Sequence, residues 1–312
     1  MQKKHGFTEL YTSYATYIHY GILVRVFLKY GVKIYSGYSL SQYNKRITKN
    51  DHYHVENYRK FKKIFSNLKD KRKKYNKAKN LIDNIFFNQR KKVEFMDYMR
   101  TDPYKNNFHD LIKNYSGVIF LPNFFESQRE WGELIFLDFY EWANFTLKLI
   151  EEKKLNIAIK PHPNIYHINK ESVEIVNELK FKYPSVDWID PSTSNKKIFK
   201  KIKFGVSPWG TILWEMAYFN VIPISAGDHP ACKYNFGYEP RNINAYENLL
   251  INGHKLIKKK IHRKSIYEFC YMYYIHNNDS FKNKARLLKL NQIDFSDSGS
   301  LITFINKMKN EI

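Results

Sequence analysis

The sequence predicts an α/β protein built around a parallel sheet, and two observations carry this prediction. From residue 117 onward, short apolar runs alternate with segments whose apolar residues recur at helical spacing. Strands that alternate with helices are joined by right-handed crossovers and form a parallel sheet. Several of the apolar runs are followed directly by glycine, proline and polar residues. In a parallel sheet such turns meet at one edge.

Composition supports a folded chain in a reducing compartment. The chain has 312 residues, enough for two domains, and with 43% hydrophobic residues it can bury a core, which excludes a wholly disordered protein. Cys232 and Cys270 are too few for a disulfide framework and have no metal-ligand spacing. The first residues lack the apolar core of a signal peptide, and no window approaches the run of about 20 apolar residues that spans a bilayer. We therefore expect a cytoplasmic protein.

The formal charge of +22 has two alternative explanations. Nucleic acid, an anionic membrane face and a phosphorylated substrate would all be attracted to such a chain. Lysine, asparagine, isoleucine, tyrosine and phenylalanine also dominate together, as an AT-rich coding sequence produces. The densest basic run has 11 cations between Arg59 and Lys79 against Asp70 alone. We interpret it as a solvated helical hairpin over residues 53–89, with a membrane-surface or acidic-acceptor contact as the functional alternative.

The N-terminal part reads as a helix followed by a strand. Apolar residues of one helical face recur over residues 11–30 at Ile18, Ile22, Leu23, Val26, Phe27 and Tyr30. Gly31 ends this helix, and residues 32–35 read as a strand. No strand is predicted before the helix, whereas a doubly wound domain opens with one. Either the chain begins inside its first lobe or that lobe is reduced and rich in helix.

Asp102-Pro103 and Asn106-Asn107 predict a domain boundary. Residues 1–105 then form an N-terminal lobe with a basic helical insertion, 106–245 a Rossmann-like lobe, and 246–312 helices that pack on the lobes. The elements expected beyond the boundary are strands over 118–121, 156–159, 186–189, 204–206 and 221–224, helices over 131–153, 170–183, 195–201 and 211–218, and further helices from Tyr246.

Polar residues follow the predicted strands and make up the candidate site. They are Lys160, His162, Ser207, Gly210, Thr211, Asp228 and His229, joined by Asn123, Glu126 and Ser127 after the first strand of this lobe. Because ligands bind at the carboxyl ends of strands in an open parallel sheet, we expect these residues along one edge and one cleft.

The residue types in this set suit a phosphorylated ligand. Lys160 and His162 can place positive or hydrogen-bonding groups against phosphate oxygens. Gly210 allows close approach of a ligand to the backbone, and Thr211 is expected to cap the next helix, whose free amides and dipole face an anion. Glu215, one turn further, can accept hydrogen bonds from a ribose or sugar hydroxyl. The simpler interpretations are an ordinary loop, an ordinary helix start and a surface carboxylate.

Several other chemistries have no support in the sequence. It contains no Gly-x-x-x-x-Gly-Lys phosphate loop, no Gly-x-Ser-x-Gly elbow and no His-Glu-x-x-His metal site. Gly-x-Gly-x-x-Gly is absent too, which argues against a standard dinucleotide enzyme. No RNP-type or helix-turn-helix signature supports binding to nucleic acid. We expect no metal and no cofactor.

The order of these motifs resembles that of a known family. The segments that carry the resemblance are Asn123-Phe124-Phe125-Glu126-Ser127, Phe136 to Trp142, Ile159-Lys160-Pro161-His162-Pro163-Asn164, Gly210-Thr211 with Glu215, and Ala226-Gly227-Asp228-His229-Pro230. They resemble bacterial capsular-polysaccharide and surface-carbohydrate biosynthesis proteins with a GT-B glycosyltransferase fold. The early segment from His5 to Tyr11, continuing through Arg25 and Gly31, also resembles the helix that such proteins carry in their first lobe. The likeness covers residues 7–35 and 117–230.

The resemblance implies two Rossmann-like lobes facing each other across a cleft, with a nucleotide-sugar donor in the second. His162 with Lys160 would contact the donor phosphate, and Thr211 and Glu215 would contact phosphate and ribose or sugar. Such enzymes work without a bound metal, so side chains and helix dipoles stabilise the leaving nucleotide. The base would come from the first lobe, where Glu9 is the candidate with His5 behind it.

The function expected from this resemblance is a glycosyltransferase of capsule or lipopolysaccharide synthesis. It would transfer a sugar from a nucleotide-activated donor to a saccharide or lipid-linked acceptor, in peripheral contact with the inner face of the cytoplasmic membrane. Two alternatives stay open. One is a polyol-phosphate transferase with a CDP-linked donor and the same fold, and the other is a non-catalytic basic scaffold or nucleic-acid-binding protein.

Overall fold

The computed structural model describes residues 6–12, 14–36, 45–50, 57–87, 104, 113–168, 170–276 and 297–309. The chain divides into two compact units. Unit 1 comprises Met1–Leu68, Arg129–Trp131 and Cys270–Ile312, and unit 2 comprises Lys69–Gln128 and Gly132–Phe269. The first division falls between Leu68 and Lys69 and not near residue 105, so most of the expected basic insertion belongs to unit 2.

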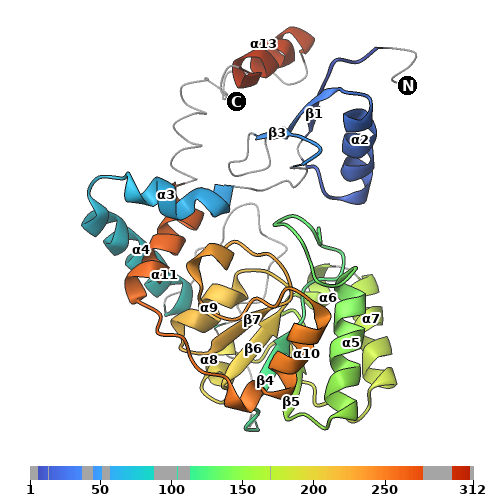
Figure 1. Ribbon diagram of the computed structural model, residues 1–312, viewed down its shortest axis with the longest axis vertical. Coiled ribbons are helices and arrows are strands. Elements are labelled where there is room, and N and C mark those ends of the chain that lie inside the picture. Colours follow the sequence, from blue (N-terminus) through green and yellow to red (C-terminus); the bar gives the residue numbers. More distant parts are fainter. Residues whose placement is uncertain are drawn as a thin grey trace. The chain divides into compact units, whose positions relative to one another are not determined.

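Unit 2 is built on a four-stranded parallel sheet (Figure 1). Its strands are β4 (Gly117–Phe120), β5 (Ile157–Lys160), β6 (Phe204–Ser207) and β7 (Ile222–Ser225), in the order β5-β4-β6-β7. Every residue of all four strands is buried, as in parallel sheets covered on both faces. The predicted α/β architecture and these four strands are confirmed.

Two isolated parallel bridges extend this sheet at both edges. Trp188 pairs with Ile159 of β5, and Tyr238 pairs with Ile224 of β7. Numbered along the chain, the six segments then stand in the order 3-2-1-4-5-6, which is that of a doubly wound α/β sheet. The strand expected over 186–189 is thus present only as the bridge at Trp188, because two backbone hydrogen bonds with Ile159 are all the pairing it makes.

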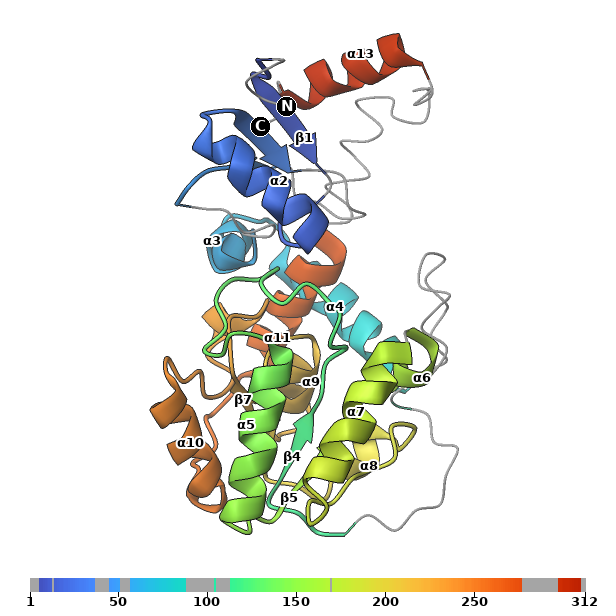
Figure 2. The same cartoon turned by 90° about the vertical axis from the view of Figure 1, so that its right-hand side faces the viewer.

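Helices cover the sheet on both faces. α5 (Phe139–Glu152) and α7 (Lys170–Lys182) lie side by side on one face (Figure 2), and α9 (Ile212–Tyr218) packs on β6 and β7. The remaining helical elements of unit 2 are α4 (Lys71–Phe86), α6 (Ile165–Ile168), α8 (Asn195–Phe199), η2 (Cys232–Tyr234), α10 (Ile243–Ile251), η3 (Gly253–Lys255) and most of α11 (Arg263–Cys270).

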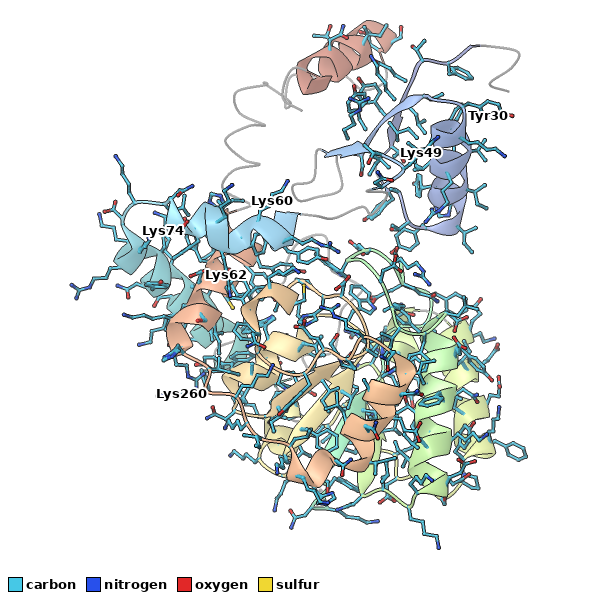
Figure 3. The ribbon with its side chains drawn as sticks, viewed as in Figure 1. Tyr30, Lys49, Lys60, Lys62, Lys74 and Lys260 are labelled. Atoms are coloured by element: carbon cyan, nitrogen blue, oxygen red, sulfur yellow. The ribbon has the colours of Figure 1, made fainter. Side chains whose placement is uncertain are left out.

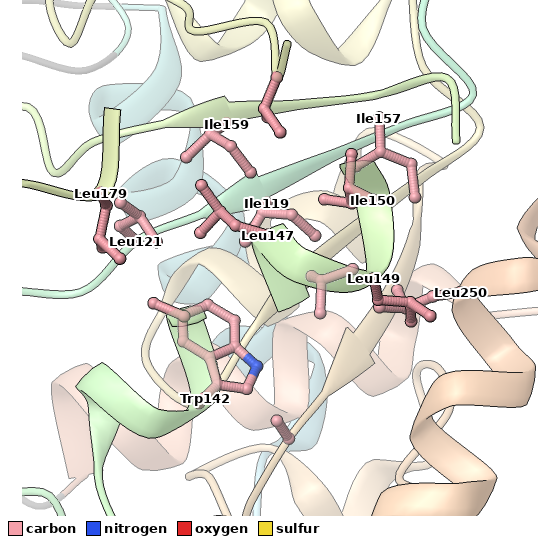
Figure 4. Close-up of a cluster of buried hydrophobic side chains, with 14 of the residues drawn as sticks. Ile119, Leu121, Trp142, Leu147, Leu149, Ile150, Ile157, Ile159, Leu179 and Leu250 are labelled. Carbon is pink, nitrogen blue, oxygen red and sulfur yellow. The ribbon is translucent and has the colours of Figure 1, made fainter. Parts of the chain in front are cut away.

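The core of unit 2 lies between α5 and the sheet (Figure 4). Trp142 and Leu147 of α5 are almost fully buried against strand residues such as Ile119 and Ile159. The indole Nε1 of Trp142 donates a hydrogen bond of 2.9 Å to the hydroxyl of Tyr246, so the one polar atom of this ring is satisfied inside the core.

Helix α5 begins at Phe139 and not at residue 131 as predicted. The side chain of Asp138 accepts a hydrogen bond from the amide of Glu141 and caps the helix. Upstream, Leu134 forms an antiparallel bridge with Gly227. The segment before Asp138 therefore pairs with residues that follow β7 and is not helical. The helical spacing of its apolar residues did not indicate this pairing.

Unit 1 contains a βαβ unit, which corrects the expectation that no strand precedes the first helix. Glu9–Thr12 forms β1, which pairs in parallel with β2 (Lys33–Ser36), and β3 (Lys45–Ile47) adds to β2 in the antiparallel direction. Helix α2 (Ile18–Lys29) connects the two parallel strands and starts seven residues later than predicted. The expectation of a reduced lobe was based on the absence of a strand before the first helix, and β1 is that strand.

Helix α2 buries the opposite face from the one that we expected. Gly21, Val24 and Phe27 pack into a small core with Ile34 of β2 and Ile47 of β3. Most of the predicted apolar stripe is exposed instead, at Ile18, Ile22, Leu23, Val26 and Tyr30. Both sides of this helix carry apolar residues, so their spacing alone did not identify the buried side.

The predicted helices of the basic segment are present as α3 (Phe61–Ser66), preceded by η1 (Asn57–Lys60) in unit 1, and α4 in unit 2. They bury Phe61 and Phe65 and, in α4, Ile82 and Phe86, while most of the cations are exposed. Unit 1 also includes η4 (Tyr271–His276) and α13 (Ser298–Lys309). Within the ranges that the structure covers, no helix combines the length and apolar character needed to cross a bilayer.

Candidate functional site

The strand order of unit 2 identifies the carboxyl ends of β4 and β6 as the expected ligand-binding position. From β4 the chain continues to β5 on one side, and from β6 it continues to β7 on the other side. The space between these two strand ends is the switch point of the sheet, where open α/β folds bind their ligands. Residues 121–127 follow β4 and residues 208–211 follow β6, and both segments hold residues of the predicted site.

Lys160 ends β5 and is almost completely buried, with 1% of its surface exposed. Its Nζ donates a hydrogen bond of 3.0 Å to the carbonyl oxygen of Pro191. Burial lowers the pKa of Lys160 to about 7, although Asp190 and Glu215 favour its charged form. Near neutral pH this lysine therefore gains or loses a proton in response to a nearby charge.

His162 presents a hydrogen-bond donor beside Lys160. The amide of Asn164 donates to its Nδ1 over 3.2 Å, so the neutral ring carries its proton on Nε2. Burial, reinforced by the charge of Lys160, lowers the pKa of His162 to about 4. The ring is therefore neutral at pH 7, and among the described residues none accepts a hydrogen bond from Nε2.

Glu215 is buried in α9 and does not face solvent. Only 4% of its surface is exposed, and its Oε2 accepts a hydrogen bond from the hydroxyl of Tyr104. The backbone oxygen of Tyr104 in turn accepts from Ser194 Oγ at 3.1 Å. The Tyr104 hydroxyl takes up part of the accepting capacity of Oε2. The expected sugar contact of Glu215 stays a prediction.

The turn after β6 differs in part from the prediction. The hydroxyl of Ser207 donates to the carbonyl of Trp209 at 2.9 Å and closes the turn. Gly210 has a φ of +107°, a left-handed conformation that favours glycine, and no atom would contact a Cβ there. Thr211 stands directly before α9, but its φ and ψ of −70° and −24° are helical and its side chain makes no capping hydrogen bond. The predicted cap is therefore wrong.

The residues after β4 combine one anchored side chain and one ionisable side chain. Asn123 Oδ1 accepts hydrogen bonds from the amide of Phe125 at 3.2 Å and from Ser172 Oγ at 2.9 Å, which ties this turn to α7. Ser127 is buried. Burial raises the pKa of the Glu126 carboxyl to about 7. Within the described ranges Glu126 has no hydrogen-bonding or charged side-chain partner, so burial alone keeps it partly protonated near neutral pH.

Asp228 and His229 take part in a different network. Asp228 Oδ2 accepts from the amide of Glu133 at 3.1 Å, and its Oδ1 lies 3.5 Å from Arg241. His229 Nε2 lies 3.3 Å from Glu239 Oε1, and its Nδ1 accepts from the amide of Ala231 at 3.2 Å. These contacts hold the loop after β7 to neighbouring segments. Within the described part of the chain, no hydrogen bond or ion pair joins Asp228 or His229 to Lys160 or His162.

This second network borders a pocket of about 550 Å³. The pocket is lined by Glu133, Leu134, Ile135, Gly227, Asp228, Glu239, Pro240, Arg241, Asn242, Ile243 and Asn244. Sequence reasoning missed most of these residues, because the pairing of residues 133–135 with 226–228 joins segments about 90 positions apart. It also missed Tyr104, which no local pattern distinguishes.

The residue proposed as base belongs to unit 1. Glu9 is in β1 of unit 1, and it accepts a hydrogen bond of 3.3 Å from the hydroxyl of Tyr11. Burial first and Glu9 second raise the pKa of Tyr11. His5 lies outside the described residues. The assignment of Glu9 as base stays a prediction. Among the described residues no cluster of three or more His, Cys, Asp or Glu could hold a metal ion.

Comparison of the chain with protein-family models, with curated proteins and with solved structures finds no match. The interpretation of the site therefore rests on the strand order of unit 2 and on the chemistry of its strand ends.

Proposed function

We propose that unit 2 binds the phosphate groups of a nucleotide-activated sugar and that the protein is a GT-B-type glycosyltransferase. The observation that carries this proposal is the Nε2–H of His162, which has no acceptor among the described residues, next to the buried Lys160 at the end of β5. A neutral imidazole N–H donates a hydrogen bond to a phosphate oxygen, and an adjacent ammonium supplies the charge. In a site of low dielectric both interactions are stronger than in water.

Lys160 is proposed to act through its charge. Its amine is held on the Pro191 carbonyl, and its pKa of about 7 leaves it only partly protonated at neutral pH. A bound diphosphate favours the ammonium form and raises this pKa, so the protein takes up a proton as the donor binds. The charge gained would also stabilise the nucleotide as it leaves.

The transfer step needs a proton acceptor for the attacking hydroxyl. The acceptor oxygen bonds to the anomeric carbon, the bond between this carbon and the phosphate oxygen of the nucleotide breaks, and the hydroxyl proton moves to a carboxylate. Glu126 and Glu9 are the two candidates for that carboxylate. Glu126 has the pKa suited to general base catalysis near pH 7, while Glu9 would belong to the acceptor lobe of a two-lobed GT-B enzyme.

The first experiment measures donor binding to the full chain by isothermal titration calorimetry, in two buffers of different ionisation enthalpy. We expect His162→Ala to weaken binding of a nucleotide sugar by tenfold or more. The matched control is His167→Ala, which removes an exposed histidine of the same turn region. Proton uptake at pH 7.5 is expected in the wild type and absent in Lys160→Met. Unchanged affinity in His162→Ala contradicts the proposal.

The donor class is decided by the set of ligands tested. UDP-, GDP- and CMP-linked sugars are compared with a CDP-linked polyol, since the resemblance leaves both donor types open. If the protein binds only the CDP-linked polyol, the proposed function becomes that of a polyol-phosphate transferase and not of a glycosyltransferase. RNA binding with a steep salt dependence, and no nucleotide binding, would favour the basic scaffold instead.

A further inference from the structure

Helix α2 of unit 1 presents an apolar face that the core of this unit does not use. The exposed fractions are 79% for Ile18, 60% for Ile22, 40% for Leu23, 46% for Val26 and 51% for Tyr30. We refer to these five residues as the outer face of α2. Ile18, Ile22, Val26 and Tyr30 are spaced four residues apart and therefore form one stripe along the helix. Figure 3 shows Tyr30 at the end of this helix, pointing away from the sheet.

The opposite side of α2 already supplies the core. Gly21, Val24 and Phe27 are buried against the sheet of unit 1. A helix that needed only to cover this sheet would carry polar residues on its outer side. Apolar side chains that are clustered and this exposed are characteristic of a surface that binds a partner or a membrane.

The charge around the outer face identifies the chemistry of its partner. Between residues 10 and 50 the chain has no aspartate or glutamate, but it has Arg25, Lys29, Lys33, Lys45, Arg46 and Lys49. Arg25 and Lys29 are exposed residues of α2 itself. An apolar stripe on a helix whose charged side chains, Arg25 and Lys29, are both cations complements a surface with an apolar interior and negatively charged headgroups.

Tyrosines at the ends of the helix fit the same surface. Tyr30 lies just after its last turn, and Tyr17 directly precedes its first residue, with the ring of Tyr14 at a centroid separation of 5.2 Å from that of Tyr17. Tyrosine is enriched at membrane–water interfaces, where the ring lies among the headgroups and the hydroxyl reaches water.

We propose that the outer face of α2 docks the protein on an anionic lipid bilayer. The helix lies flat on the surface over a length of about 18 Å. Ile18, Ile22 and Val26 insert among the acyl chains, and Arg25 and Lys29 extend their charged ends to the lipid phosphates. The docking requires no nucleotide and is independent of the function proposed for unit 2. It also places the membrane contact on α2 and not on the basic segment of α3 and α4.

The test is a flotation assay of the full chain with vesicles of phosphatidylcholine containing 30% phosphatidylglycerol, and with vesicles of phosphatidylcholine alone. We expect binding to the anionic vesicles that weakens at high salt. The double variant Ile22→Glu/Val26→Glu should reduce the partition coefficient at least tenfold. Phe181→Glu is the matched control, because Phe181 is an apolar residue that is 89% exposed on α7 of unit 2.

Three results would overturn the proposal. The first is wild-type protein that does not bind anionic vesicles. The second is binding that survives Ile22→Glu/Val26→Glu but is lost when Lys71, Arg72 and Lys73 of α4 are replaced by glutamine. The third is a dimer in light scattering that this double variant dissociates, without any vesicle binding, which would make the outer face a contact between two copies. Far-UV circular dichroism of each variant checks that the fold is retained.

Discussion

Replacing Glu126 with glutamine should remove a pH dependence from the stability of unit 2. Glu126 follows β4 at the switch point, and burial raises the pKa of its carboxyl from 4.5 to about 7. In the unfolded chain the same group ionises with its ordinary pKa. Between these two values the unfolded chain loses its proton while the folded protein keeps it. Stability contributed by the neutral carboxyl is therefore fully present below pH 4.5, falls as the pH rises and is lost above pH 7.

The size of this effect follows from the separation of the two pKa values. A difference of about 2.5 pH units corresponds to a ceiling of about 3 kcal/mol. The side chain of Glu126 is half-buried, so water screens part of the free-energy penalty of ionising its carboxyl. We expect a loss of about 2 kcal/mol between pH 4.5 and pH 8 in the wild type. Glutamine has nearly the same shape and no charge, so Glu126→Gln should be more stable than the wild type at pH 8 by a similar amount.

The assay is urea unfolding at several pH values, followed by tryptophan fluorescence. Trp142, Trp188, Trp209 and Trp214 lie in unit 2, and Trp131 in unit 1, so the signal reports mainly on unit 2. Glu174→Gln, at an exposed position of α7, is the control and should follow the wild type at every pH. A stability difference between wild type and Glu126→Gln that stays constant from pH 4.5 to pH 8 would refute the reasoning.

Two further predictions concern the core and edge of unit 2. Tyr246→Phe leaves the buried Nε1–H of Trp142 without its 2.9 Å acceptor and should cost about 1–3 kcal/mol in unfolding free energy; an unchanged urea midpoint would contradict this. In Gly237→Ala the new Cβ would lie 1.9 Å from the carbonyl oxygen of Pro223, beside β7. We expect a loss of about 1–3 kcal/mol, measured as a lower melting temperature, and full wild-type stability would show that this edge rearranges freely.

The strands of unit 2 could be predicted because their signal is local. Each is a short run of consecutive apolar residues with a turn directly after it, and a strand buried on both faces needs no more than this. The same locality placed Lys160 at the end of β5 and Gly210 next to α9. The turn conformations were harder to predict. Thr211, for example, has the residue type of a helix cap but not the backbone geometry of one.

The errors arose where a distant partner decides the structure. Residues 9–12 become a strand because they pair with residues 33–36, and no local pattern distinguished them from a helix. The side on which α2 is buried depends on which side faces the sheet, and both sides of this helix are apolar. Asp228 and His229 follow β7 as expected, but their contacts with Glu133, Glu239 and Arg241 could not be read from the sequence, and their role as donor-binding residues stays a prediction.

The sequence by itself determined the α/β class, the four strands of the parallel sheet and the order of polar residues behind them, since these depend on contacts within a few residues. Only the tertiary structure decided the strand order, and with it the position of the switch point. It also decided the neutral state of His162, the burial of Lys160 and the raised pKa of Glu126, because desolvation depends on how much of the chain surrounds a group. The exposed face of α2 became apparent for the same reason: whether a side chain is buried depends on which other parts of the chain cover it.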